Sequence, residues 1–229
     1  MNYRHRTKRI SAWRYLLAMP RSMWYNLRLL PWRQARRMPI LVSNRTVMEC
    51  LSGKVELDAT DLRIGMVKVG FTTFQGSDYR RERTRLNIRG KLVLGGECSL
   101  GAGSSVEVAE EGVLTIGPQF NLGPRSLIIC HKAITFGTFD RISWDCTLMD
   151  TDQHALVDGD GKRVNEDRPI HFGDNVWVGC HVIVAKGVSL ADNTTVAAGA
   201  CVAGRHEETE TVLEGNPATI VRRGVKRQQ

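Results

Sequence analysis

The first 48 residues of the chain contain no aspartate or glutamate, although they hold eleven lysines and arginines. The whole chain has a formal net charge of +8, and this positive excess comes entirely from that segment. The chain also lacks any apolar run near the roughly 20 residues that a membrane-spanning helix needs. Arg14 interrupts the first apolar run, which argues against a cleavable signal peptide. We therefore expect a cytoplasmic protein, with the inner membrane face as an alternative location for its basic segment.

Cysteine pairs with metal-binding or redox spacing are also absent. None of the six cysteines lies in a C-x-x-C pair or in another zinc-like spacing. We expect no bound metal and interpret the cysteines as reduced thiols of a cytosolic protein. They are Cys50, Cys98, Cys130, Cys146, Cys180 and Cys201.

What the chain has instead is a six-residue repeat. From Ile170 to Arg205 it reads IHFGDN, VWVGCH, VIVAKG, VSLADN, TTVAAG, ACVAGR. The third position of each hexad holds a bulky apolar residue, and the fourth holds glycine or alanine. A period of six fits neither an amphipathic helix nor the alternating strands of a meander. It is typical of a solenoid, whose similar steps stack and bury one continuous core.

The two fixed positions have a physical explanation. The bulky residue points inward from a short strand, and the small residue follows where the backbone turns and space is scarce. Three such sides make one triangular turn, and successive turns hydrogen-bond in parallel. The sequence therefore predicts a mainly β fold, a left-handed parallel β-helix, which is an exception to the usual right-handed crossover. A basic, partly helical extension precedes it.

The repeat continues less regularly toward the N-terminus. Large apolar residues stand before glycine at Leu94-Gly95, Leu100-Gly101, Ile116-Gly117, Leu122-Gly123 and Phe136-Gly137. We expect an N-terminal extension over residues 1–50, the solenoid over residues 51–205, and a C-terminal segment over residues 206–229.

The N-terminal extension mixes its basic residues with aromatic ones. Such a mixture fits the interface of an anionic membrane. The interpretation we favour is a pair of short helices that cover the open end of the solenoid, and the two roles are compatible. Nucleic acid is the third possibility, and we expect no nucleic-acid partner. The aromatic residues are Trp13, Tyr15, Trp24, Tyr25 and Trp32.

A polar stretch at residues 155–169 interrupts the repeat and is interpreted as an extruded loop. It follows Asp150-Thr151-Asp152-Gln153-His154 directly. Histidine is the usual side chain for removing a proton from a hydroxyl, with a carboxylate orienting its ring. In an extended segment Asp150, Asp152 and His154 would project to one side, so either carboxylate is a candidate partner for the imidazole. A solvated turn or a cation site is the alternative for this motif.

Three motifs then give the chain a family resemblance. They are Val-Trp-Val-Gly at Val176–Gly179, Gly-Asn-Pro-Ala at Gly215–Ala218, and a histidine 23 residues before Trp177. With these motifs, residues 115–223 resemble the hexapeptide-repeat O-acetyltransferases, the group that includes maltose, galactoside, capsule and lipopolysaccharide acetyltransferases. The resemblance implies a homotrimer that transfers an acetyl group from acetyl-CoA to a saccharide hydroxyl, on a glycan or a lipid-linked sugar.

The resemblance also implies roles for particular residues. His154 would be the general base, supported by Asp152 or Asp150, and no acyl-enzyme would be needed. Trp144 and His131 would line the acceptor pocket. CoA would lie in a groove between neighbouring subunits, against Trp177, Gly179, Cys180, Ala198, Arg205, Asn216, Pro217, Ala218, Arg222 and Arg223.

The chain departs from the family pattern in two places. Relatives often carry a Thr-Lys pair just after the last regular hexad, where this chain has Ala203-Gly204, so CoA binding would either be weaker or use Arg205 and Arg222. Residues 126–145 also match none of the family's sugar-binding residues, so the acceptor is open.

Two other functions fit the same solenoid. One is a non-catalytic scaffold at a membrane. The other is a metalloenzyme like the γ-class carbonic anhydrases, which pair two histidines five residues apart. No such pair exists among the six histidines of this chain.

Overall fold

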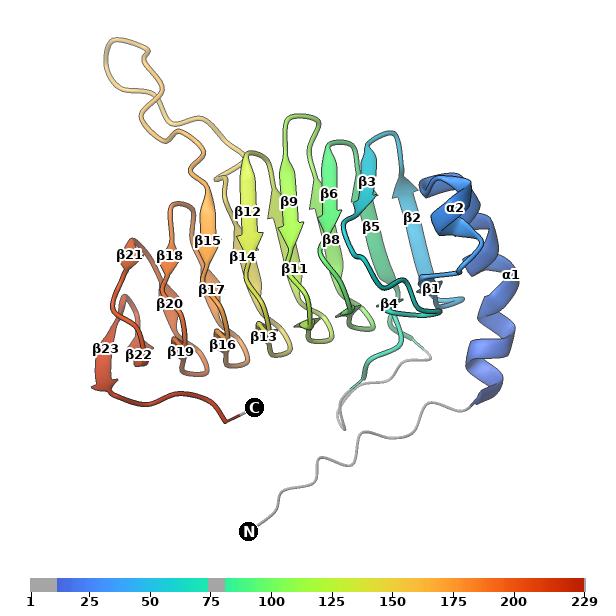
Figure 1. The fold of residues 1–229 in the computed structure, drawn as a ribbon. Helices are drawn as coiled ribbons and strands as arrows, with labels where there is room; N and C mark the ends of the chain where they lie inside the picture. The colour runs from blue at the N-terminus through green and yellow to red at the C-terminus, as the bar shows by residue number, and fades with distance from the viewer. Residues whose placement is uncertain (1–11, 74–80, 229) are drawn as a thin grey trace.

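The body of the molecule is a triangular prism made of three sheets that run along its length (Figure 1). The computed structural model describes residues 12–73 and 81–228. Residues 1–11 of the expected extension and residues 74–80 of the expected solenoid lie outside this described part. Each turn of the chain contributes one strand to each sheet, and neighbouring turns pair in parallel. The predicted left-handed parallel β-helix is confirmed.

The strands are short and follow one another around the prism. The first sheet contains β1 (Ile40–Val42), β4 (Val67–Val69), β7 (Cys98–Leu100), β10 (Phe120–Leu122), β13 (Arg141–Ile142), β16 (Trp177–Val178), β19 (Thr195–Val196), β22 (Thr211–Gly215) and β23 (Ala218–Arg223). The second contains β2 (Thr46–Cys50), β5 (Thr84–Ile88), β8 (Ser105–Val108), β11 (Leu127–Cys130), β14 (Thr147–Met149), β17 (Ile183–Val184) and β20 (Cys201–Val202). The third contains β3 (Lys54–Leu57), β6 (Lys91–Leu94), β9 (Val113–Ile116), β12 (Ala133–Phe136), β15 (Ile170–Phe172), β18 (Ser189–Leu190) and β21 (Arg205–His206).

The bulky third-position residues form the core, as the repeat predicts. Val178, Val184 and Leu190 are each at most 1% exposed. Three phenylalanines add a ladder of aromatic rings inside the prism. The ring centroid of Phe136 lies 4.6 Å from that of Phe120 and 4.8 Å from that of Phe172. Tilted rings at these distances contribute beyond the area that they bury.

The small fourth-position residues lie at corners where the backbones of adjacent turns nearly touch. A Cβ atom added to Gly117 would lie 2.2 Å from the carbonyl oxygen of Gly137, one turn further on. At Gly123 the same atom would lie 2.4 Å from the backbone of Ser143. Because backbone atoms of paired strands cannot retreat without breaking the ladder, these corners accept only the smallest side chains.

The N-terminal end of the prism is closed by α1 (Ala12–Leu29), which is followed by the short α2 (Trp32–Ala35) (Figure 1). Two buried side chains of α1 bond to the outer edge of β1. Asn26 bonds to both the backbone N–H and the carbonyl of Ile40, and the Ser22 hydroxyl accepts the Val42 N–H at 2.9 Å. The helix therefore satisfies backbone groups that an open edge strand would leave unpaired.

Strand pairing extends beyond both expected boundaries of the solenoid. At the start, β1 already pairs in parallel with β4, so the first turn begins at Ile40 rather than at residue 51. At the other end, β22 pairs in parallel with β19 and turns back into β23. These terminal strands lack the hexad pattern, because a helix or a hairpin covers them instead of another full turn.

The corner packing leads to a prediction about stability. Gly117→Ala should lower the free energy of unfolding by about 1–3 kcal/mol, because the added methyl forces two backbones apart. Gly159→Ala is the matched control, since nothing lies within 4 Å of a Cβ at that position. Denaturant titration followed by circular dichroism measures both. Equal stabilities of the two variants would contradict the corner model.

Candidate active site

The segment that carries His154 leaves the prism at the edge between the second and third sheets. It follows β14, and the polar stretch at residues 155–169 projects from the prism before β15 begins, as expected for an extruded loop (Figure 1). A short bridge between Val157 and Arg163 closes the loop on itself. His154 thus lies where an edge of the prism meets this loop.

Asp150 anchors the base of this segment. Its carboxylate is fully buried and accepts the backbone N–H groups of His131 at 2.7 Å, Lys132 at 2.8 Å and Ala133 at 2.7 Å. These residues belong to the preceding turn, so Asp150 ties the two turns together at the edge. Its oxygens are directed at backbone donors and not at the His154 ring.

Asp152 points to the other side and belongs to a polar cluster. Its Oδ2 atom accepts hydrogen bonds from the ammonium of Lys186 and, at 2.8 Å, from the amide of Asn165. The bond from Lys186, with a smaller contribution from Asn165, lowers the pKa of the Asp152 carboxyl. The expectation that Asp150, Asp152 and His154 share one side is therefore wrong. Gln153 has a φ of 59°, which ends the alternation of an extended strand.

Asn165 fixes the loop against His154. Its Nδ2 donates to the His154 carbonyl at 2.8 Å, and its Oδ1 accepts the Leu156 N–H at 2.7 Å. The His154 N–H also bonds to the Asp152 carbonyl at 2.7 Å. The backbone of His154 is thus held from two sides while its side chain is exposed. Within the described part of the chain, the imidazole makes no hydrogen bond.

Asn165 and Lys186 are site residues that sequence reasoning missed. Lys186 occupies the fifth position of its hexad, where the repeat tolerates any polar residue. Asn165 lies in a loop without periodicity. The one sequence feature that could have drawn attention to this cluster is that Lys186 is the single lysine of the regular hexads. That feature does not identify Asp152 as its partner.

Four of the residues expected to contact CoA, namely Trp177, Gly179, Cys180 and Ala198, lie at or beside another edge, between the first and second sheets. Trp177 on β16 is 42% exposed, and its indole N–H donates to the Ser143 hydroxyl at 3.4 Å. Directly after this strand, Gly179 is buried and Cys180 is half-buried. The Cys180 carbonyl accepts the Gly199 N–H at 2.8 Å, and the neighbouring Ala198 is exposed. This edge is separated from His154 by the width of the second sheet.

An ion pair beside this edge was also missed. Arg125 donates two hydrogen bonds to the Asp145 carboxylate, which lowers the pKa of that carboxyl. His181 lies nearby, with its Nε2 3.8 Å from Asp145. Trp144 is half-buried on the same edge and accepts the His181 N–H through its carbonyl. Trp144 and His131, the two residues expected to line the acceptor pocket, therefore lie at different edges, because His131 bonds to Asp150 at the edge between the second and third sheets.

The C-terminal candidates lie around β21 and the β22–β23 hairpin. Asn216 and Pro217 are exposed at the hairpin tip, and the following Ala218 is buried. Arg205 pairs with Glu207, and Arg223 pairs with Glu208 at 2.8 Å. Arg222 is exposed and has no ion pair among the described residues. Of the three arginines, Arg222 is therefore the one whose charge is unneutralised.

The structure also bears on two other kinds of catalysis, one with a cysteine nucleophile and one with a bound metal ion. Burial raises the pKa of the Cys98 and Cys130 thiols to about 12 and that of Cys146 to about 11, so these cysteines are poor nucleophiles. Within residues 12–73 and 81–228, no group of three or more His, Cys, Asp or Glu side chains is placed to hold a metal ion.

The fold is a hexapeptide-repeat solenoid with an exposed histidine where its loop leaves the prism, and the comparisons with known proteins find acetyltransferases among its relatives. The galactoside O-acetyltransferase of Escherichia coli K12 is 37% identical over 109 residues, which cover 47% of this chain and 52% of that enzyme. A putative acetyltransferase of Saccharomyces cerevisiae is 38% identical over 55 residues. The resemblance to hexapeptide-repeat O-acetyltransferases is confirmed. The chain spans about half of the first of these relatives and 28% of the second.

Two further matches cover most of the chain. An uncharacterized 24.8 kDa protein in the cps region of Klebsiella pneumoniae is 24% identical over 198 residues, 86% of this chain and 85% of that protein. The crystal structure of the polySia specific acetyltransferase NeuO matches with a TM-score of 0.50 at 19% identity, over 81% of this chain and 90% of that one. This likeness concerns the fold. No family model matches the chain.

The anchoring of the His154 segment generates a second prediction. Asp150→Asn should lower the free energy of unfolding by about 1–3 kcal/mol, because an amide cannot accept all three backbone N–H groups that the buried carboxylate now accepts. Asp152→Asn makes the same chemical change at an exposed carboxylate and should cost less than about 1 kcal/mol. Urea titrations compare them. A cost at Asp150 no larger than that at Asp152 would contradict the anchoring role.

Proposed function

We propose that this protein is an acetyl-CoA-dependent O-acetyltransferase that acetylates a hydroxyl of a saccharide, with His154 as the general base. The observation that carries the proposal is the placement of His154, which is held by its backbone at an edge of the solenoid while its ring is exposed. The 37% identity to a galactoside O-acetyltransferase over 109 residues supports this reaction class. The names of that relative and of NeuO favour a saccharide acceptor, and we propose a glycan or a lipid-linked sugar.

The chemistry requires one proton transfer and one acyl transfer. The imidazole takes the proton of the acceptor hydroxyl as that oxygen attacks the thioester carbonyl of acetyl-CoA. Backbone N–H groups near Cys180 and Ala198 would stabilise the negative charge that develops on the carbonyl oxygen. Collapse of the tetrahedral intermediate expels the CoA thiolate, which receives the same proton from the imidazolium and leaves as the free thiol, while the acetyl ester stays on the saccharide. Neither step requires a cysteine nucleophile or a metal.

The proposal includes a homotrimer, because the two halves of the site lie on different edges of one chain. His154 lies between the second and third sheets, whereas Trp177, Gly179, Cys180 and Ala198 lie along the first sheet and the edge that follows it. A neighbouring copy packed against the prism would bring one chain's histidine to the other chain's groove. The exposed Arg222, with Arg205 and Arg223, would then face the CoA phosphates, while Asn216, Pro217 and Ala218 would lie at the adenine end.

We further propose that α1 holds the enzyme at the cytoplasmic face of a membrane. Its outward face presents Trp13, Leu16, Leu17, Met23, Trp24 and Leu27, each between 49% and 62% exposed. Arg28 is exposed near the end of the same helix, where it can meet anionic headgroups. Among the described residues no helix has the length and apolar character to cross a bilayer. The six free cysteines fit a reducing compartment.

The catalytic role of His154 predicts a loss of turnover. His154→Ala should lower the rate by about 10²–10⁴, because a positioned general base contributes that much. His171→Ala, at an exposed histidine on β15, is the control. The assay mixes the protein with acetyl-CoA and a panel of saccharides and follows release of the CoA thiol. A near-normal rate for His154→Ala would remove this residue from the mechanism.

A binding measurement separates the enzyme from a non-catalytic scaffold of the same fold. Acetyl-CoA at about a hundred times its Kd should stabilise the folded protein by about 2.7 kcal/mol and raise its Tm accordingly. Differential scanning fluorimetry with millimolar acetyl-CoA detects this shift. An unchanged Tm would favour the scaffold.

The outward face of α1 predicts membrane binding. The substitutions Trp13→Ala and Trp24→Ala together should reduce co-sedimentation with vesicles of phosphatidylglycerol and phosphatidylcholine by about tenfold, because buried aromatic area drives such binding. Ile64→Ala removes a side chain that is 65% exposed outside the helix and serves as the control. Substitution is preferable to deletion because α1 also closes the prism. Equal sedimentation of all three proteins would contradict the anchor.

A further inference from the structure

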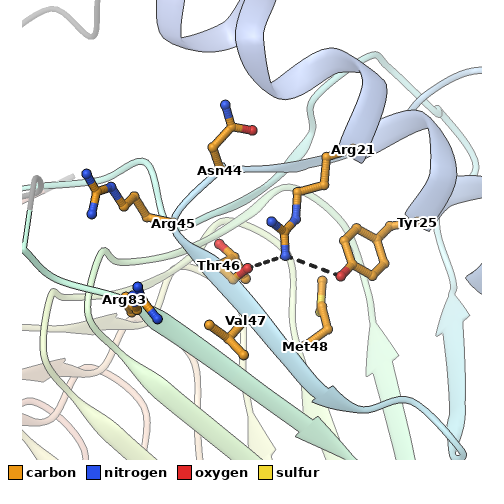
Figure 2. A pocket seen from close by; sticks show the side chains of 8 residues that line it. All are labelled: Arg21, Tyr25, Asn44, Arg45, Thr46, Val47, Met48 and Arg83. Atoms are coloured by element: carbon orange, nitrogen blue, oxygen red, sulfur yellow. Dashed lines mark hydrogen bonds between the residues drawn. The ribbon is translucent and has the colours of Figure 1, made fainter.

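A basic pocket lies between α1 and the first turn of the solenoid, away from the His154 edge. It has a volume of about 390 Å³ and is open to solvent. Figure 2 shows Arg21 and Tyr25 projecting from α1 toward β2, with Arg45 and Arg83 on the opposite side of the view, directly before β2 and β5. The remaining lining residues are Asn44, Thr46, Val47 and Met48.

The pocket gathers positive charge without a compensating carboxylate. Of the described residues that line it, three are arginines and none is acidic. Two other arginines of the solenoid are neutralised: Arg85 bonds to Glu49 at 2.7 Å, and Arg125 bonds to Asp145. Guanidinium groups that line one cavity repel one another, and an anion between them would offset this repulsion.

Arg21 is fixed at the inner wall. Its Nη2 atom donates to the Thr46 carbonyl and, at 3.4 Å, to the Tyr25 hydroxyl (Figure 2). The Nε atom of the same guanidinium is buried without a hydrogen-bond partner in the described part of the chain. The Arg21 guanidinium also lies 5.6 Å from the centre of the Tyr25 ring. This guanidinium is therefore held in place before any ligand arrives.

Arg45 and Arg83 form the outer wall and are exposed. Neither makes an ion pair or a side-chain hydrogen bond within residues 12–73 and 81–228. Arg45 extends away from Arg21 in Figure 2, and a change of rotamer would be needed to turn its guanidinium over the cavity. Asn44 adds a neutral amide donor at the rim.

We propose that Arg21, Arg45 and Arg83 bind a phosphate group in this pocket. A guanidinium presents paired donors that match two phosphate oxygens, and several of them together select for a multiply charged anion. The pocket lies directly beneath the helix whose outer face is apolar. The phosphate can therefore come from an anionic lipid headgroup or from a soluble phosphate ester, and the experiment distinguishes the two sources.

The test uses the full chain and a pair of variants matched in charge. Arg83→Gln removes one guanidinium from the pocket, and Arg89→Gln makes the same change at the other end of β5, at an exposed arginine outside the pocket. One arm titrates sodium pyrophosphate by calorimetry. The other measures co-sedimentation with vesicles of phosphatidylglycerol in phosphatidylcholine, against phosphatidylcholine alone.

The proposal predicts that Arg83→Gln weakens binding by about tenfold in at least one arm, because a charged hydrogen bond is lost, while Arg89→Gln stays near wild type. Loss in the pyrophosphate arm identifies a soluble phosphate ester, and loss with phosphatidylglycerol vesicles alone identifies a lipid headgroup. Arg45→Gln should repeat the result of Arg83→Gln. If neither pocket variant differs from Arg89→Gln in either arm, the pocket does not bind phosphate.

Discussion

The close approach of backbones at the corners of the prism is the constraint on which the rest of the structure depends. Adjacent turns can pair along all three sheets only if the chain bends sharply, and at Gly117 and Gly123 the next turn leaves no room for a side chain. This requirement produces the alternation of bulky and small residues. It also makes the edges of the prism rigid, because each corner is fixed by the turns on both sides.

A rigid edge can hold a reactive side chain in place, and His154 lies at such an edge, where the loop leaves the prism after β14. Asp150 ties the departing chain to the backbone of the preceding turn, and Asn165 ties the loop back to His154. The imidazole is thereby displayed at a fixed point without a protein partner of its own in the described residues. Such a group suits a reaction in which both substrates arrive from outside the chain.

The parts of this account that the sequence could predict are those that repeat. Val178 and Phe172 were assignable to the core because every hexad places a bulky residue there. The anchoring role of Asp150 was not predictable, because its partners are backbone amides of another turn. The sequence around Gln153 also gives no indication of its positive φ. An extended backbone was therefore the natural expectation, and it places Asp152 and His154 on one side. The cap formed by Ser22 and Asn26 likewise depends on contacts between segments distant in sequence.

The central claim is that one chain supplies the histidine and its neighbour supplies the acetyl-CoA groove. Subunit mixing tests it most directly: His154→Ala and Ala198→Trp, each inactive alone, are combined as co-refolded or co-expressed chains and assayed for thiol release from acetyl-CoA. If the site is shared, random mixing restores roughly a quarter of the sites, since each needs an intact histidine from one chain and an intact groove from the next. Mixed assemblies with no activity above that of the separate variants would contradict the claim.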